Sequence, residues 1–257
     1  MSKFLIALLP LAVACQGAPE PEPVEPSPAA DPHAGHDHAD CPHARTEAGS
    51  LHMDHGHSFE HAEKWAAIFD DPQRDTWQKP TELVVALGIQ PGMAVADIGA
   101  GTGYFEPHLA GAVGAEGKVI ALDPEPDMVA HMKARFEKDP LPQVEVRQSE
   151  NADTKLTAGE ADLLLMVNTY HHITERPVFF TKLAATLKPG GRLAVVDYSP
   201  GETPHGPPAA MRIAPETVKA ELEGSGWVQS QVLDPLPEQF ALIFTVASAS
   251  AEAAVAE

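Results

Sequence analysis

Apolar runs alternate with helical patterns along residues 94–246. The runs are short, rich in Val, Ile, Leu and Ala, and have the length of buried strands, whereas the segments between them repeat apolar residues at helical spacing. Strands that alternate with helices predict an α/β fold whose mostly parallel sheet is covered on both faces. The expected strands are 94–98, 119–123, 144–147, 161–167, 193–197, 228–234 and 240–246. The expected helices are 104–113, 126–137, 176–187 and 215–224.

The two ends of this pattern define a single domain. Only Pro235, Leu236 and Pro237 separate the last two strands, so these strands are expected to form an antiparallel hairpin at one edge of a seven-stranded, doubly wound sheet. Helical patterns also precede the first strand, and they span 59–69, 74–80 and 81–87. The domain is therefore expected over 62–246, and an Ala- and Glu-rich tail follows at 247–257.

The first 15 residues have the pattern of an export signal. Lys3 precedes an apolar run, residues 4–14, that is too short to span a bilayer and suits a secretory signal peptide. The sequence Leu11-Ala12-Val13-Ala14-Cys15 resembles a bacterial lipobox, although Ala12 stands where Leu is usual. The resemblance implies a lipidated Cys15 that anchors the protein in the cell envelope, facing the periplasm. The alternative is an ordinary cleaved signal peptide.

Two polar segments follow the signal. Residues 16–32 are rich in Pro and Glu and are expected to form an extended linker. Residues 33–61 are rich in His, and their side chains are candidate ligands for zinc, copper or nickel. The candidate ligands are His36, His38, Cys41, His43, His52, His55 and His57. Because no strict zinc-site spacing is present, the alternative is a polar linker whose histidines have no specific role.

The charge of the chain argues against one class of partner. The net charge is −20, and residues 61–257 alone hold 15 basic and 28 acidic residues. A domain this acidic repels a phosphate backbone. Nucleic acid is therefore not expected as substrate or partner.

The main chemical motif lies at the end of the first expected strand. Glycines at alternate positions, Gly99, Gly101 and Gly103, permit a tight turn and close approach of the backbone to a ligand. Dinucleotide-binding proteins use similar turns, so the glycines alone are weak support for any one cofactor. The acid before them, Asp97, suits a cationic amino group rather than a pyrophosphate. A second acid, Asp123, ends the next strand, where it can bind two ribose hydroxyls.

Four segments together resemble one enzyme family. Residues 97–103, Asp-Ile-Gly-Ala-Gly-Thr-Gly, match the D/E-x-G-x-G-x-G signature of class I S-adenosylmethionine-dependent methyltransferases at every position. Residues 119–124 resemble the ribose strand of that family, and 162–173 resemble its fourth strand and the loop that follows. Residues 187–197 match its Leu-Lys-Pro-Gly-Gly turn into strand five. The resemblance implies a Rossmann-like fold, S-adenosyl-L-methionine as cofactor and methyl transfer as the reaction.

The resemblance also implies roles for individual residues. Asp97 and the glycines would hold the methionine part of the cofactor, and Asp123 would hold its ribose. The loop after strand three would close the adenine pocket, but its sequence departs from the family pattern and leaves Glu150 and Asn151 as alternatives. The expected cofactor-binding residues are Asp97, Gly99, Ala100, Gly101, Thr102, Gly103, Tyr104, Asp123, Pro124, Glu150, Asn151 and Asn168.

Residues for the acceptor side are less well specified. Tyr170, His171 and His172 follow the fourth expected strand, at the sheet edge where ligands of open α/β folds bind. Either histidine could take a proton from an acceptor, and the alternative is that both serve loop packing. Trp65, Trp77 and Gln78 are candidates to cap the cofactor, with core packing the alternative for the two tryptophans. The Pro- and Gly-rich residues 199–213 are expected to form either a lid or an unordered surface loop.

Two functions remain open from the sequence. The first is an active methyltransferase for a small-molecule or envelope acceptor. The second is a non-catalytic cofactor-fold binding protein of the cell envelope with a metal-binding, His-rich tether. The export signal favours the second, because S-adenosylmethionine is made in the cytoplasm, whereas the intact glycine motif and both acids favour the first.

Overall fold

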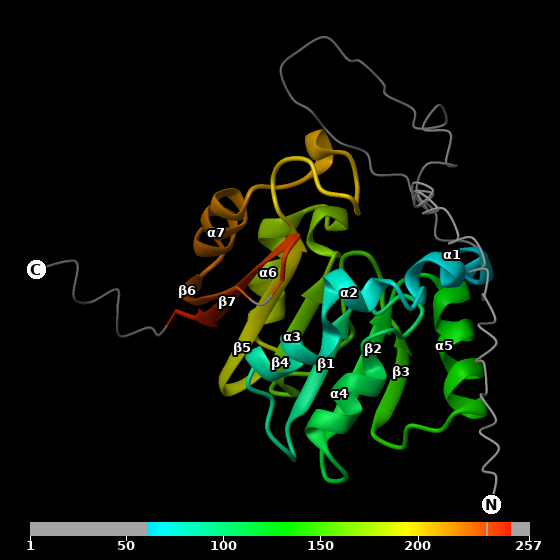
Figure 1. Ribbon diagram of the computed structural model, residues 1–257. Coiled ribbons are helices and arrows are strands. Elements are labelled where there is room, and N and C mark those ends of the chain that lie inside the picture. The colour runs from blue at the N-terminus through cyan, green and yellow to red at the C-terminus, as the bar shows by residue number, and fades with distance from the viewer. Residues whose placement is uncertain (1–60, 235, 248–257) are drawn as a thin grey trace, which may run out of the picture. The chain divides into compact units, whose positions relative to one another are not determined.

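The computed structural model describes residues 61–234 and 236–247. They contain a seven-stranded sheet with the order β3-β2-β1-β4-β5-β7-β6 (Figure 1). Strands β1 to β5 pair in parallel, and β7 is antiparallel to both neighbours. The strands are β1 Ala94–Ile98, β2 Lys118–Asp123, β3 Val144–Gln148, β4 Ala161–Val167, β5 Leu187–Tyr198, β6 Trp227–Leu233 and β7 Gln239–Val246. The predicted mostly parallel sheet with an antiparallel C-terminal hairpin is confirmed.

One strand is longer than its sequence pattern predicts. β5 begins at Leu187 rather than at residue 193, because Leu187 pairs with Ala161 before the register shifts and the regular pairing resumes at Arg192. The glycine-containing turn that the sequence suggested is thus an irregular part of the strand itself. The strand order reverses between β1 and β4, and such a reversal opens the crevice in which open α/β sheets bind ligands.

Helices lie on both faces of the sheet (Figure 1). α3 and α4 pack against one face through a core that includes Leu83, Leu109 and Val119. α6 and α7 contribute to the core on the opposite face, where Phe180 and Trp227 are fully buried. The helices are α1 Ala62–Phe69, α2 Arg74–Gln78, α3 Pro80–Ala86, α4 Glu106–Val113, α5 Pro126–Lys138, α6 Arg176–Ala184 and α7 Pro215–Glu223. Two 3-10 helices, η2 Tyr170–His172 and η3 Ala209–Met211, complete the described elements.

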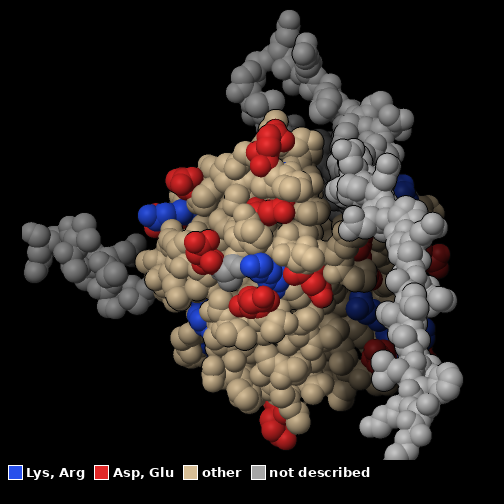
Figure 2. Space-filling view, in the orientation of Figure 1, with Lys and Arg blue, Asp and Glu red and all other residues tan. Residues whose placement is uncertain are grey.

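The surface agrees with the acidic composition. Figure 2 shows acidic and basic side chains scattered over one face of the domain, with no extended basic patch on that face. Within the described part of the chain, no helix is both long enough and apolar enough to cross a bilayer. The signal peptide, the linker, nearly all of the His-rich segment and most of the C-terminal tail lie outside the described residues.

Candidate active site at the carboxyl edge of the sheet

The glycine turn, Gly99–Gly103, connects β1 to α4 with little free space around it. Gly99, Gly101 and Gly103 have φ angles of 80°, 59° and 84°, in the left-handed region that favours glycine. A Cβ atom at Gly99 would lie 2.6 Å from Cγ2 of Thr169, and one at Gly103 would lie 2.8 Å from Cζ of Phe136. These contacts show that the turn requires glycine for space as well as for backbone conformation.

Asp123, the last residue of β2, is hydrogen-bonded to the glycine turn. Its Oδ2 accepts a hydrogen bond of 2.8 Å from the Gly101 N–H, and its Oδ1 accepts one of 2.9 Å from the Glu125 N–H. Burial raises the pKa of Asp123 to about 6, although both backbone hydrogen bonds oppose the shift. Pro124, also predicted to bind cofactor, accepts a bond from Gln148 through its carbonyl oxygen.

Asp97, the last acid before the turn, is 3% exposed and lies among other ionisable groups. Burial raises its pKa to about 7, with the Arg74 guanidinium opposing the shift and Asp123 adding to it. Glu106, the first residue of α4, is fully buried beside it. The Glu106 carboxyl is hydrogen-bonded to the Asp97 carboxyl, and among the described residues neither of its oxygens accepts a bond from another side-chain N–H or hydroxyl. Burial first, and then the charge of Asp97, raise the pKa of Glu106 well above its usual range.

Helices α1 and α2 form a roof above the turn. Arg74 donates a hydrogen bond of 2.8 Å to the Phe69 carbonyl, and its guanidinium lies 3.9 Å from the centre of the Tyr104 ring. The Tyr104 hydroxyl in turn donates to Asp75. Asp70 accepts from the buried Thr102 hydroxyl at 2.9 Å. Thr102 and Tyr104 are therefore tied to the roof as well as to the turn.

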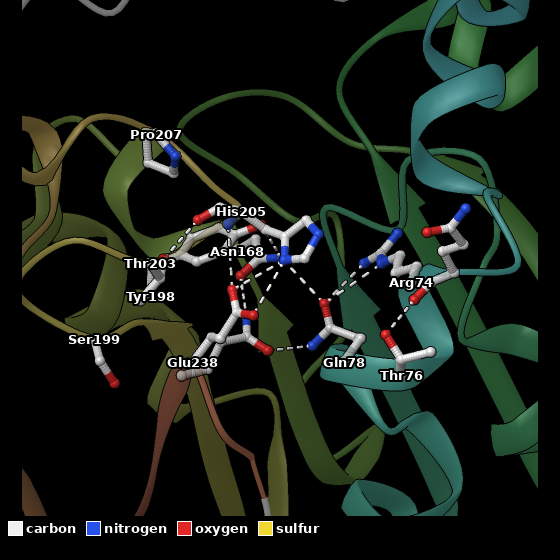
Figure 3. A network of polar contacts seen from close by, with 12 residues as sticks. Arg74, Thr76, Gln78, Asn168, Tyr198, Ser199, Thr203, His205, Pro207 and Glu238 are labelled. Carbon is white, nitrogen blue, oxygen red and sulfur yellow. Dashed lines mark hydrogen bonds and ion pairs between the residues drawn. The ribbon is translucent and has the colours of Figure 1, made fainter. Parts of the chain in front are cut away.

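On the β4 side of the roof, three carboxamides form a closed ring, which we call the amide ring. Gln78 donates to Gln239, Gln239 donates to Asn168, and Asn168 lies 3.4 Å from the Gln78 Oε1 atom and 3.4 Å from the Tyr198 hydroxyl. Figure 3 shows Gln78 between Arg74 and Asn168, with its oxygen turned toward the guanidinium. Asn168 has a φ of 58°, which turns the chain away from β4. The ring joins α2 to the ends of β4 and β7.

The predicted lid, residues 199–213, is ordered around one side chain. The Arg212 guanidinium donates to four carbonyl groups within the lid, at 2.8–3.1 Å. Those carbonyls belong to Ser199, Gly201, His205 and Pro207. This self-contained network contradicts the alternative of an unordered surface loop.

The lid also contacts the roof. His205 stacks on Trp77 of α2 with ring centres 4.7 Å apart, and its Nδ1 lies 3.1 Å from the Glu238 carboxylate (Figure 3). A Cβ atom at Gly206 would lie 2.5 Å from the Tyr198 ring, so lid and strand β5 are in close contact. Trp77 therefore joins the roof to the lid, while Trp65 stacks on Phe69 within α1.

The three candidates for proton transfer occupy different surroundings. Tyr170 is fully buried, stacks on Phe180 and donates through its hydroxyl to Glu221 of α7 at 2.6 Å. His171 is 7% exposed, and its Nδ1 lies 2.9 Å from Asp197 near the end of β5. The His172 ring lies against that of His171, with ring centres 4.1 Å apart and the planes tilted by 43°.

The two adenine candidates lie in the loop after β3. The Glu150 side chain is 67% exposed and pairs with Lys155 at 2.9 Å, and Asn151 is also exposed. Ser149 is buried, and its N–H donates to the Asp123 carbonyl at 3.0 Å. The loop is thus attached next to the predicted ribose site, but Glu150 is directed to Lys155.

The predicted metal ligands, His36 through His57, lie outside the described residues. In the described ranges, 61–234 and 236–247, no three His, Cys, Asp or Glu side chains gather in a way that could hold a metal ion.

This site belongs to a fold shared with known proteins. A family model described as a methyltransferase domain matches residues 95–191. The crystal structure of a SAM-dependent methyltransferase from Aquifex aeolicus is 30% identical, with a TM-score of 0.69, and the match covers 72% of this chain and 98% of that one. The chain belongs to the class I S-adenosylmethionine-dependent methyltransferases.

Curated relatives of this methyltransferase give the same family. A demethylmenaquinone methyltransferase from Lactococcus lactis subsp. lactis is 26% identical over 137 residues, which is 53% of this chain and 54% of the relative. The ubiquinone/menaquinone biosynthesis C-methyltransferase UbiE from Teredinibacter turnerae is 28% identical over 124 residues, 48% of this chain and 49% of the relative. The methyltransferase spans about half the length of these relatives. The comparisons give no support to the non-catalytic alternative.

The residues at this site fit S-adenosylmethionine by their chemistry. The glycine turn lets the backbone approach a ligand closely, the buried Asp97 can accept the cationic amino group, and Asp123 can accept from ribose hydroxyls. Sequence reasoning missed Arg74, Glu106, Asp197 and Gln239. Arg74 and Gln239 carry no motif, and only their burial near the turn and the amide ring brings them to notice.

Proposed function

We propose that this protein transfers the methyl group of S-adenosylmethionine to a small, neutral acceptor that carries a hydroxyl group on a flat ring. One observation carries the proposal: the glycine turn and its two acids lie at the carboxyl edge of the sheet, where α2 and the lid are in contact with each other. When bound, the cofactor supplies a methyl group already activated on a sulfonium. The protein then needs to align the acceptor and exclude water.

The residues around the turn would bind the cofactor by charge. Asp97 would accept the amino group, and Arg74, buried close to it, would face the carboxylate. Asp123 would exchange its present bonds to Gly101 and Glu125 for the ribose hydroxyls, or share them. These three side chains come from β1, α2 and β2, so cofactor binding would stabilise the contact between helix α2 and the sheet.

The acceptor side favours flat and uncharged molecules. Its side chains are the rings of Trp77, Tyr198 and His205 together with the amide ring. Aromatic rings stack on flat groups, and carboxamides can donate to and accept from hydroxyl or carbonyl groups. The relatives named for demethylmenaquinone and for ubiquinone and menaquinone biosynthesis support ring-shaped acceptors as the first class to examine.

His171 is the residue we propose as proton acceptor. With Asp197 bound to Nδ1, the proton of a neutral imidazole is held at Nδ1 and the lone pair is placed on Nε2. The same Asp197 also accepts from the Tyr198 N–H at 2.8 Å, so its own orientation is fixed. Asp197 is thus a positioning residue. His171→Gln should lower the turnover number while leaving the Michaelis constant nearly unchanged, and Asp197→Asn should act in the same direction to a smaller degree.

Cofactor binding tests the proposal directly. Calorimetric titration of the full chain with S-adenosylmethionine should give binding in the micromolar range, and no binding at high micromolar cofactor would contradict the proposal. Asp123→Asn should weaken affinity about tenfold or more, because it removes a charged acceptor. Asp139→Asn, a change of the same type at an exposed position after α5, should leave affinity unchanged.

The acceptor class is tested by transfer of a radiolabelled methyl group. Phenols, naphthols and quinols should be methylated, whereas aliphatic carboxylates and oligonucleotides should not. Methylation of only the charged compounds would overturn the proposed acceptor class and leave cofactor binding intact.

The proposed location follows from the N-terminal sequence. A lipidated Cys15 would hold the domain at the cell envelope, and the linker and the His-rich segment would separate it from the lipid. Cys15→Ser should release the protein into the soluble fraction after cell breakage. Titration of the full chain with Zn²⁺, Cu²⁺ or Ni²⁺ tests the His-rich segment, and millimolar or weaker binding would reduce it to a linker.

A further inference from the structure

Glu106 is a buried acid that the proposed mechanism has not used. It is 0% exposed, its side-chain hydrogen-bond partner among the described residues is the Asp97 carboxyl, and neither of its oxygens accepts a bond from another side-chain N–H or hydroxyl there. A buried carboxyl whose partner is a second acid is costly, because it loses its contacts with water and gains no compensating cation. A side chain buried in this way is expected to gain a compensating partner when a ligand binds.

Its surroundings identify the kind of partner. Glu106 lies beside Asp97, and the two carboxyl groups interact strongly. Two adjacent buried carboxyls do not both ionise unless a cation compensates them, so the pair retains a proton. The position of Glu106 at the start of α4 favours its ionised form once compensation is available.

The cations already present are engaged elsewhere. Arg74 of α2 faces Asp97 but is bonded to Phe69 and Gln78 and stacked over Tyr104. Arg135 of α5 faces Glu106 but is bonded to the Asp70 carboxylate and to the Thr102 carbonyl.

One further acid faces the pair. Asp123 of β2 faces Asp97 and adds negative charge. The pair therefore has room for one more positive charge.

We propose that Asp97 and Glu106 form a carboxyl pair that holds one proton and releases it to solvent when the cationic amino group of the cofactor binds beside Asp97. The Glu106 O–H bond breaks, the proton goes to solvent, and the ammonium group keeps its own three protons. Two carboxylates then face one ammonium group, so the pair with the bound ammonium carries the same net charge as the pair with its proton. Glu106 is thus a positioning residue for the cofactor-binding acid. The inference rests on the proposed function, because it takes S-adenosylmethionine as the ligand.

The proton count upon binding is the decisive measurement. The full chain is titrated with S-adenosylhomocysteine, which has the same amino group, in buffers with different ionisation enthalpies at about pH 7.5. The dependence of the observed enthalpy on the buffer gives the number of protons released. We expect the wild type to release roughly half to one proton more than Glu106→Gln. Because the same ligand is used for both, its own proton exchange cancels in the difference.

Three comparisons make the result specific. Glu106→Gln should weaken S-adenosylhomocysteine binding about tenfold, because one charged acceptor is lost. Glu116→Gln, a change of the same type at an exposed site after α4, should alter neither affinity nor proton release. 5′-Methylthioadenosine, which lacks the amino acid portion, should bind wild type and Glu106→Gln equally.

The outcomes separate the inference from the proposed function. If wild type binds and Glu106→Gln matches it in affinity and proton release, the carboxyl pair has no role and the inference is overturned. If wild type does not bind at all, the proposed function itself fails. Infrared difference spectra of the wild type provide a test without a variant: ligand binding should remove a protonated carboxyl band, and an unchanged band would also overturn the inference.

Discussion

The carboxyl edge of this sheet has two parts that are built in different ways. The part over β1 and β2 is made by a contiguous turn, Gly99–Gly103, by Asp97, the last but one residue of β1, and by Asp123, the last residue of β2. The part over β4, β5 and β7 is made by the amide ring, Trp77 and the lid, which come from segments far apart in the sequence. We expect the first part to bind the cofactor through backbone conformation and charge, and the second part to enclose the bound molecules through side chains.

This difference predicts that one part tolerates substitution less than the other. A turn in which a Cβ would lie 2.6 Å from a neighbouring side chain can hardly vary without losing its shape. The aromatic and amide side chains of the roof can be replaced one at a time, and under the proposed function their replacement would change which acceptor fits. We expect changes in the first part to abolish cofactor binding, and changes in the second to leave cofactor binding largely intact.

The largest expected effect is at the glycine turn. Gly99→Ala combines a positive φ with the contact to Thr169, and it should lower the free energy of unfolding by about 3 kcal/mol or more. Binding of S-adenosylhomocysteine should be lost. The control is Gly92→Ala, where φ is 86° and nothing lies within 4 Å of the new Cβ. This change should lower the free energy of unfolding only by the strain of the left-handed backbone, about 1–2 kcal/mol, and should retain binding of S-adenosylhomocysteine. Equal effects of the two changes would contradict the close-packed turn.

The next largest effect is the pH dependence of stability in the free protein. Burial raises the pKa of Asp97 to about 7 and that of Asp123 to about 6, so the folded state binds protons more tightly than the unfolded state. The free energy of unfolding should therefore fall as pH rises from about 4 to 7, by on the order of 2–3 kcal/mol. Chemical denaturation at several pH values measures this slope.

A variant identifies the source of the slope. Asp97→Asn should reduce the slope without abolishing it, since the amide does not titrate while Asp123 and Glu106 still do, and Asp139→Asn should leave the slope unchanged. A stability that rises over this pH range in all three proteins would show that the acids at the cofactor side do not dominate the titration.

A smaller effect is expected at the acceptor side. Gln239→Ala removes two contacts of the amide ring and leaves buried polar groups of Gln78 and Asn168 without partners, which should cost about 1–3 kcal/mol. S-adenosylhomocysteine affinity should change by less than about threefold, because the glycine turn is untouched. Gln231→Ala on the exposed face of β6 is the matched control and should be nearly neutral. A large loss of cofactor affinity would mean that the two parts are coupled through Arg74.

The smallest effect is expected at the contact between lid and roof. His205→Ala removes a ring stacked on Trp77 and a partly exposed pair with Glu238, which should cost about 1 kcal/mol or less. Tryptophan fluorescence should change, since Trp77 loses its stacked neighbour. His131→Ala on α5 should leave the emission unchanged, and an unchanged spectrum in His205→Ala would argue against the stacked lid.

Much of the cofactor side was predictable from the sequence. The strand ends, the three glycines and the two acids are close in sequence to the elements that position them, and the period of apolar residues locates those elements within a few residues. The surroundings of Tyr170 could not be predicted, because a residue after a strand end can turn back into the core, as Tyr170 does against Phe180. Glu106 and Arg74 gave no signal, since a charged residue in an amphipathic pattern is ordinarily exposed.

The sequence by itself determined the α/β class and the glycine turn between β1 and α4. These features depend on local periodicity, on backbone conformations open only to glycine, and on charges at adjacent strand ends. Only the tertiary structure decided the strand order, the amide ring, the ordered lid and the burial of Glu106 beside Asp97. Each of these depends on contacts between residues distant in the chain, and packing rather than local preference selects such contacts.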